Sequence, residues 1–281
     1  MMNPIEIKQV SKSFSNFSID NLNLKIPKGF ITGFIGPNGS GKSTTIHMIM
    51  DTLKPSKGTI NLFGTPNEHA SVKQKIGFVY DELYMYENFT IKKMKSLIAP
   101  LYSNWNPDLF NSYLNKFDLP IQVKIKEFSK GMKMKCSLLF ALSHDPELLI
   151  MDEPTAGLDP IFRRELIDLL QELMINENRT IFFSTHITTD LDRIADYIVF
   201  INKGEVVFQK SMEEIDENYH LIKAKKEWLD ADTEKLFIST QQTEQGFTGL
   251  FEGDHSAFTD FPDDVVIEKA SLEDIMYFMT R

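Results

Sequence analysis

The sequence lacks several features that would define its class at once. It contains one cysteine, Cys136, which excludes a disulfide within the chain and indicates a reducing compartment. No stretch approaches the ~20 apolar residues that a membrane-spanning helix needs. The start of the chain carries no basic segment followed by an apolar one, so we expect no signal peptide. We therefore expect a cytoplasmic chain that reaches a membrane only through a partner.

Positive charge is also scarce. Lys and Arg total 30 residues against 40 Asp and Glu, so the formal net charge is −10. A chain of this charge lacks the broad basic surface that nucleic acid requires, and we expect no nucleic-acid partner. The hydrophobic fraction of 42% over 281 residues is enough for one large or two smaller domains.

The apolar runs predict a sheet in the first two thirds of the chain. Residues 5–10 and 22–26 both alternate between apolar and polar positions in the manner of an edge strand. Three runs, at residues 30–36, 147–154 and 179–186, are continuously apolar, which is typical of parallel strands covered on both faces. Further strands are expected at 58–64 and 75–80, and a hairpin at 197–210 with its turn at 202–204.

The segments between and after these strands differ in pattern. Helical spacing predicts a mostly helical insert over residues 83–144 and an amphipathic helix over 160–178. After residue 213 the chain becomes acidic and its strands become weak, at 220–224, 235–240 and 247–251, before a helix at 271–279. We therefore expect two domains, 1–212 and 213–281, the second a small α+β extension that supports packing or dimer formation, or else regulates the first.

The segment GPNGSGKS at 36–43 matches the pattern G-x-x-x-x-G-K-[ST] of phosphate-binding loops. It follows an apolar strand and precedes a helical segment, which is the context that the pattern requires and which makes a chance match rare. Its glycines let backbone N–H groups face inward toward phosphate oxygens. We expect Lys42 to reach the β- and γ-phosphates, Ser43 to ligate Mg²⁺ and Thr44 to hold the α-phosphate. The predicted nucleotide-binding residues here are Gly36, Pro37, Asn38, Gly39, Ser40, Gly41, Lys42, Ser43 and Thr44.

Acidic residues follow the second buried strand. In LLIMDEP the adjacent Asp152 and Glu153 point in different directions and can take different roles. We expect Asp152 to complete the Mg²⁺ shell and Glu153 to act as the base that orients the attacking water, since phosphoryl transfer depends mainly on positioning and charge stabilisation. The alternative is a solvated acidic turn before a proline.

His186 ends the third buried strand. Ligands bind at the carboxyl edge of an open parallel sheet, and three predicted strand ends meet there. A histidine at this edge can hydrogen-bond a γ-phosphate and the attacking water. The alternative is an ordinary histidine at a strand end.

The order of these segments resembles the nucleotide-binding subunit of ABC transporters. The resemblance covers about residues 1–212 and rests on GPNGSGKST (36–44), FSKGM (128–132), LLIMDEPTAGLDP (148–160) and STH (184–186). It implies a P-loop NTPase core of class α/β, with an antiparallel β subdomain and a helical subdomain. It also implies ATP hydrolysis with Mg²⁺, and a separately encoded transmembrane permease.

The same resemblance assigns further residues. Phe14 falls where an aromatic ring stacks on adenine, and Ser129 and Gly131 fall in a signature turn that contacts the γ-phosphate bound by the opposite subunit. Residues 156–159 match a loop that couples the two sites. Two ATP molecules would be held between two subunits, identical or sister chains, arranged head to tail.

Two positions depart from the family pattern. Asp81 stands where the family usually has glutamine, and as a shorter, charged residue it can still meet the metal, through water or directly; the alternative is a plain acidic turn. The usual signature L-S-G-G-Q becomes F-S-K-G-M. Here Ser129 is expected to cap the following helix, and Lys130 to point either at a phosphate or at solvent.

Residues 75–119 resemble one branch of the family. This branch contains ATPase subunits of exporters from low-GC Gram-positive bacteria that handle antimicrobial or amphipathic peptides, including the phenol-soluble modulin exporters. Two other functions remain open: an ABC ATPase outside transport, working in translation or DNA repair, and a regulatory module that binds ATP without turnover.

Overall fold

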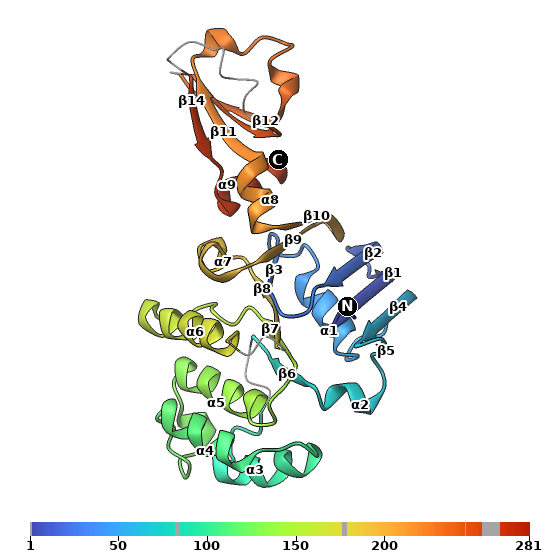
Figure 1. Cartoon of the computed structure of the whole chain (residues 1–281), viewed down its shortest axis with the longest axis vertical. Coiled ribbons are helices and arrows are strands. Elements are labelled where there is room, and N and C mark those ends of the chain that lie inside the picture. Colours follow the sequence, from blue (N-terminus) through green and yellow to red (C-terminus); the bar gives the residue numbers. More distant parts are fainter. Residues whose placement is uncertain (1, 82–84, 176–178, 245, 255–264) are drawn as a thin grey trace.

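The computed structural model describes residues 2–81, 85–175, 179–244, 246–254 and 265–281 (Figure 1). The helices of these residues are α1 (Lys42–Ile49), α2 (Ala70–Lys73), α3 (Ile91–Ile98), α4 (Pro107–Lys116), α5 (Lys130–Leu142), α6 (Pro160–Leu173), α7 (Thr188–Ile194), α8 (Met212–Asn218) and α9 (Leu272–Met279). The strands are β1 (Ile5–Ser13), β2 (Ser18–Ile26), β3 (Ile31–Ile35), β4 (Lys57–Leu62), β5 (Thr65–Pro66), β6 (Ile76–Val79), β7 (Leu148–Asp152), β8 (Thr180–Thr185), β9 (Tyr197–Asn202), β10 (Glu205–Ser211), β11 (Tyr219–Ala224), β12 (Phe237–Gln242), β13 (Phe247–Glu252) and β14 (Val266–Lys269).

A six-stranded sheet forms the centre of the molecule, in the order β10-β9-β3-β8-β7-β6. The pairs β9–β3, β3–β8, β8–β7 and β7–β6 are parallel, and β10 returns antiparallel to β9. All side chains of β3, β7 and β8 are buried, as their continuous apolar runs predicted. The strands expected over 30–36, 147–154 and 179–186 and the hairpin over 197–210 are confirmed.

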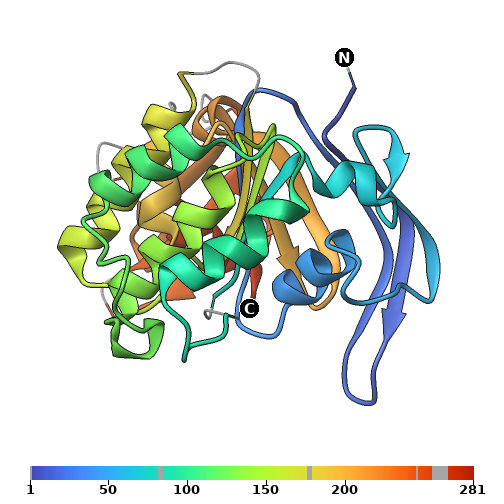
Figure 2. The same cartoon turned by 90° about the horizontal axis from the view of Figure 1, so that it is seen from below.

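An antiparallel sheet of four strands, β2-β1-β4-β5, lies beside this core, as the views in Figures 1 and 2 show. The prediction of residues 5–10 as an edge strand is wrong, because β1 pairs with β2 on one side and β4 on the other. Alternation indicates that one face of a strand is buried and the other is exposed to solvent. It does not report whether the strand has one neighbour or two.

Helices α3 to α6 stand on the other side of the central sheet from the antiparallel sheet (Figure 2). The start of the predicted helical insert at 83–84 lies outside the described residues, and within the rest the helices α3, α4 and α5 confirm it. Helix α6 ends at Leu173, so it is shorter than the predicted 160–178, of which 176–178 is not described. None of the helices in the described ranges combines the length and apolar character that crossing a bilayer demands.

The last part of the chain forms a separate antiparallel sheet, β12-β13-β11-β14, with helix α9 beside it. The three weak strands and the final helix are confirmed, whereas α8 and β14 were not expected. Both are short, and β14 (VIEK) shows neither alternation nor a long apolar run. One face of this sheet joins the main core through Tyr219, Leu221 and Leu250, which belong to the same buried cluster as the central sheet.

Candidate functional site

The phosphate-loop segment connects β3 to α1 in the expected way. Gly36 cannot be replaced without rearrangement, because a Cβ at this position would lie 2.2 Å from the backbone oxygen of Ile201. Gly41 has a φ of 112° and is the residue that immediately precedes α1. This backbone region favours glycine, so the turn that aims the N–H groups of α1 outward depends on it.

Lys42 is directed into the loop that precedes it. Its Nζ donates to the carbonyl oxygen of Gly36 at 2.8 Å and lies 3.3 Å from Oε1 of Glu153. The second oxygen of Glu153, Oε2, accepts from the backbone N–H of His186 at 3.2 Å and lies 2.7 Å from His186 Nδ1. Glu153 therefore links the phosphate loop to the end of β8, and the structure brings all three predicted catalytic residues together.

Glu153 occupies this place through its backbone. Its φ is 47°, in the left-handed region, and its N–H is held by the carbonyl and the hydroxyl of Ser184 on the neighbouring strand. The strand ends directly at Asp152, so the turn sends the next side chain back toward α1 rather than along the sheet. Such strain in a residue other than glycine is typical of functional sites.

Asp152 lies deeper than Glu153, with 2% of its surface exposed. Oδ1 of Asp152 accepts from the Ser184 hydroxyl at 2.5 Å, and the carboxylate also bonds to the hydroxyl of Ser43. Burial is the main cause that raises the pKa of the Asp152 carboxyl, and the charges of Asp81 and Glu153 act in the same direction. Ser184 was not predicted as a site residue, although the STH segment that contains it was noted.

These groups suit a small divalent cation. A carboxylate and a hydroxyl from Asp152 and Ser43 lie together, and the nearby acid Asp81 adds negative charge that a cation would offset. Within the described residues there is no group of three or more His, Cys, Asp or Glu that could form a cage on its own. Mg²⁺ is commonly held by one or two carboxylates together with substrate phosphates, and this donor set fits that arrangement.

A cavity of about 480 Å³ opens above the phosphate loop. Its wall brings together residues from the loop, the strand ends and α5: Phe17, Asn38, Gly39, Gly41, Lys42, Ser43, Thr44, Asp81, Lys130, Glu153, Ala156 and His186. Most of the predicted site residues thus line one hollow. The carbonyl oxygens of Gly36 and Pro37 accept hydrogen bonds from Lys42, and Ser40 is buried.

The aromatic residue at this cavity is Phe17 rather than Phe14. The two rings stack with centroids 6.4 Å apart, and the backbone turns between them, with the N–H of Phe14 donating to the carbonyl of Phe17. The turn leaves Phe14 47% exposed and outside the cavity lining. Phe17 instead lies so close to Gly41 that a Cβ there would meet its ring at 3.0 Å. A two-residue turn thus places the ring of Phe17 at the loop cavity, and the predicted stacking of Phe14 on adenine stays a prediction.

The predicted signature turn begins helix α5. Ser129 precedes the helix and its hydroxyl accepts from the N–H of Met132 at 3.2 Å, so the predicted cap is confirmed. Gly131 packs near Phe162 of α6, where a Cβ would lie 3.3 Å from the ring. Neither Ser129 nor Gly131 lines the cavity that contains Lys42.

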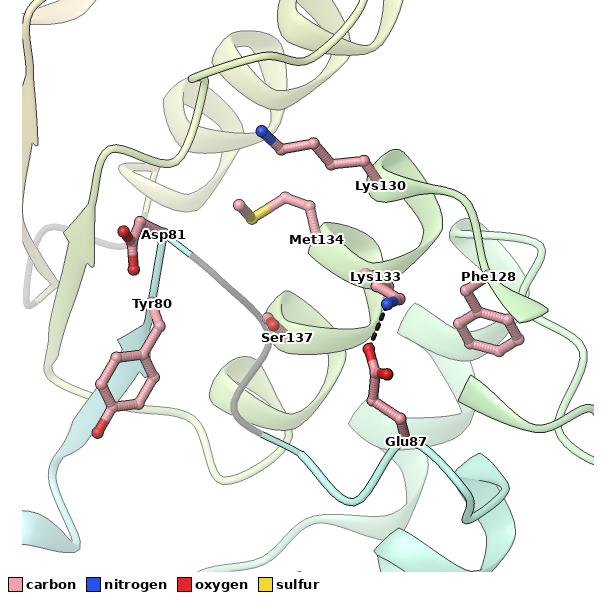
Figure 3. Close-up of a pocket in the computed structure, with 8 residues that line it drawn as sticks. All are labelled: Tyr80, Asp81, Glu87, Phe128, Lys130, Lys133, Met134 and Ser137. Carbon is pink, nitrogen blue, oxygen red and sulfur yellow. Dashed lines mark hydrogen bonds and ion pairs between the residues drawn. The ribbon is translucent and has the colours of Figure 1, made fainter. Parts of the chain in front are cut away.

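Lys130 does reach that cavity. Figure 3 shows its side chain extending away from the ion pair of Lys133 and Glu87, which lie in an adjoining cavity of about 440 Å³. A Cβ on Gly157 would lie 2.5 Å from Nζ of Lys130, so the ammonium rests against the loop that follows Glu153. The sequence left open whether Lys130 points at a phosphate or at solvent. Because the lysine borders the phosphate-loop cavity of its own chain, its position favours the phosphate.

Sequence comparisons agree with this geometry. The family model "ABC transporter" matches residues 19–156. The bacitracin transport ATP-binding protein BcrA of Bacillus licheniformis is 34% identical over 235 residues, covering 81% of this chain and 75% of the relative. The lantibiotic transport ATP-binding protein SrtF of Streptococcus pyogenes is 33% identical over 211 residues, covering 73% of this chain and 90% of the relative.

Solved structures share the same architecture. An ATP-binding subunit of an ABC transporter superposes with a TM-score of 0.69 at 26% identity, covering 76% of this chain and 92% of the other. A bacterial ABC transporter cassette solved as a dimer gives a TM-score of 0.66 at 24% identity, covering 74% and 98%. The predicted α/β fold with a P-loop core is confirmed.

Proposed function

The chain belongs to the family of ATP-binding subunits of ABC transporters, and we propose that it powers the export of peptides or of hydrophobic antimicrobial compounds. That it binds and hydrolyses ATP for transport follows from the family. The cargo class rests on the relatives, whose names connect them with bacitracin and lantibiotic transport. It also agrees with the resemblance of residues 75–119 to exporters of amphipathic peptides.

Glu153 is the proposed base of the hydrolysis. The observation that carries this proposal is its double contact, 3.3 Å to Lys42 Nζ and 2.7 Å to His186 Nδ1. A carboxylate held between a phosphate-binding cation and an imidazole can accept a hydrogen bond from water and align it with the γ-phosphate. Lys42 then stabilises the charge that develops on the phosphate oxygens, and His186 holds the carboxylate in place and bonds to the γ-phosphate.

Asp152 and Ser43 are the proposed ligands of Mg²⁺, with Asp81 as a third oxygen donor nearby. When bound, the cation would neutralise charge on the β- and γ-phosphates. The chain's own part is to keep the carboxylate fixed, which the hydroxyl of Ser184 does at 2.5 Å. The raised pKa of Asp152 supports this role, because a cation would offset the cost of burying the charge.

The proposed partner of this chain is a second ATPase subunit, identical or a sister chain, which would face the nucleotide cavity. Ser129 and Gly131 lie outside the lining of the chain's own cavity, and Ser129 has an exposed position at the start of α5. In a head-to-tail pair these groups would face the γ-phosphate held by the other subunit. The dimeric cassette of the same fold supports such a pairing.

A separately encoded permease is the proposed membrane partner, and it would hold the chain at the inner face of the cell membrane. The chain offers a large apolar hollow for it, a cavity of about 780 Å³ bordered by Phe78, Met94 and Phe140. Tyr86 and Leu101 at its border are 69% and 68% exposed, so apolar surface is available for a partner. The hollow also includes Tyr80, one residue before Asp81, which places it beside the nucleotide site.

The test is the ATPase activity of the isolated chain and of Glu153→Gln. We expect loss of turnover by a factor of about 10² or more, the usual contribution of a positioned base, with ATP still bound. Equal turnover of both proteins would show that Glu153 is not the base. Reconstitution with the permease and a bacitracin-like or lantibiotic-like peptide then tests the cargo class.

A further inference from the structure

Helix α9, near the end of the chain, packs directly onto α7, the helix that follows His186. Leu272, Ile275 and Phe278 of α9 are buried in the same apolar cluster as Leu191 and Ile194 of α7. This cluster is continuous with the central sheet. The C-terminal sheet and its helix are therefore fixed to the segment that carries the catalytic histidine.

Polar contacts reinforce this junction. Asp192 of α7 accepts a hydrogen bond from the backbone N–H of Leu272, at the start of α9. Close by, Lys269 of β14 lies 2.5 Å from Asp216 of α8. The start of α9 is thus anchored both to α7 and, through the strand before it, to α8.

Helix α7 is also held by α6. Arg163 donates from Nε to Oδ1 of Asp190 at 2.6 Å and from a terminal nitrogen to the hydroxyl of Thr189 at 2.9 Å. Helix α7 has seven residues and begins two residues after His186. It contacts both the ATPase core and α9, so the position of His186 depends on both.

A second stripe of α9 faces the histidine itself. Glu273, Met276, Tyr277 and Thr280 recur at helical spacing and form one wall of a cavity of about 430 Å³. The opposite wall consists of Pro37 of the phosphate loop and the segment from His186 to Thr189. The stripe therefore borders the same cavity as His186 and the three residues that follow it.

We propose that α9 is a positioning element for His186: it holds the His186–Thr189 segment against Glu153 and so sets the turnover of the ATPase. The proposal rests on the proposed role of His186 in hydrolysis. It gives the C-terminal extension a function beyond packing, since any partner that moves this sheet would act on the catalytic histidine through α7.

The experiment compares wild-type chain, the double variant Met276→Ala/Tyr277→Ala, and Val266→Ala, all as full-length protein. Val266 is an exposed apolar residue of β14 in the C-terminal sheet, 48% exposed against 40% for Tyr277 of α9, and it does not border the cavity. We expect the double variant to lower kcat about threefold to tenfold, a modest part of the effect that a misplaced catalytic group can have. The KM for ATP should stay within twofold, because the phosphate loop is untouched, and Val266→Ala should match wild type.

A second comparison separates positioning from general stability. In a His186→Ala background the same double substitution should have no further effect on kcat, because two residues that act through one group are not additive. Tyr277→Phe, which keeps the ring in the cavity, should retain wild-type kcat. A KM that rises together with a fall in kcat, or an equal loss with and without His186, would overturn the proposal.

The proposed function is tested separately in the same series. If wild-type chain hydrolyses ATP and His186→Ala does so equally well, the role of His186 is wrong. If His186→Ala loses turnover while the α9 double variant keeps it, only the positioning role of α9 is wrong.

Discussion

The carboxylate of Glu153 lies 2.7 Å from Nδ1 of His186 and accepts the backbone N–H of the same residue at 3.2 Å. The two residues are 33 positions apart and come from the ends of neighbouring parallel strands. This double contact fixes both the side chain and the backbone of the histidine relative to the acid. It also leaves the other carboxylate oxygen for Lys42.

The first prediction concerns this pair. His186→Ala should lower kcat for ATP by about 10²-fold or more, the range expected when a residue that orients a base is lost. Glu153→Gln should do the same, and combining the two should add little, because each substitution disables the same unit. Steady-state ATPase assays with the single and double variants measure this, and full additivity would count against a shared role.

Asp152→Asn should raise the free energy of unfolding of the chain. It should also abolish the stabilisation of the chain by Mg²⁺. Burial raises the pKa of the Asp152 carboxyl above its ordinary value of 3.8, so the folded chain binds this proton more tightly than the unfolded chain. The stability gained from that proton is fully present below the ordinary pKa and is lost as pH rises through the folded pKa. At neutral pH the buried carboxylate therefore costs free energy that asparagine would not.

We expect Asp152→Asn to raise the free energy of unfolding without nucleotide by about 1 kcal/mol at pH 7, the scale typical of relieved functional sites. The gain should shrink as pH falls toward 4, which urea unfolding at several pH values would show. With ATP present, Mg²⁺ should raise the Tm of wild type and leave that of the variant unchanged. A variant less stable than wild type at pH 7 would contradict the argument.

Lys130→Gln should weaken nucleotide binding. The ammonium borders the cavity that contains Lys42 and rests against Gly157, so its loss removes one positive charge from a phosphate-binding hollow. An exposed charge contributes up to about 1 kcal/mol, which corresponds to a rise of about twofold to fivefold in the KM for ATP. Lys130→Arg is the matched control and should keep the wild-type value.

The effect of Lys130→Gln should also fade as salt concentration rises, since exposed charges are screened. Measuring KM at low and high ionic strength checks this. If the KM at low salt is the same for wild type and Lys130→Gln, the Lys130 ammonium points at solvent rather than at the phosphate.

Cys136 should be unreactive while the chain is folded. Its side chain is fully buried in the core, and burial raises the pKa of the thiol to about 12. At pH 8 the thiolate fraction would be about 10⁻⁴, so reaction with a disulfide reagent should be on the order of 10³ times slower than for a free cysteine. Because Cys136 is the only cysteine, the absorbance of the thiol released from the reagent reports its reaction directly. The same assay in denaturant gives the rate for the exposed thiol.

Several features followed from the sequence alone. The buried strands were predicted because continuous apolar runs of strand length are typical of a sheet covered on both faces, as β3, β7 and β8 are. Asp152, Glu153 and His186 were expected near Lys42 because parallel strands present their carboxyl ends at one edge. These predictions depend on local pattern and on a rule of sheet topology, and both can be applied to a single sequence.

Other features were decided only by the tertiary structure. Which of Phe14 and Phe17 faces the phosphate loop depends on a turn that reverses the chain between them. That Lys130 borders the cavity of its own chain depends on how α5 lies beside the loop at Gly157. The approach of Met276 and Tyr277 to His186 joins segments about ninety residues apart through α7. Contacts of this kind arise from packing between distant elements, and a local pattern carries no record of them.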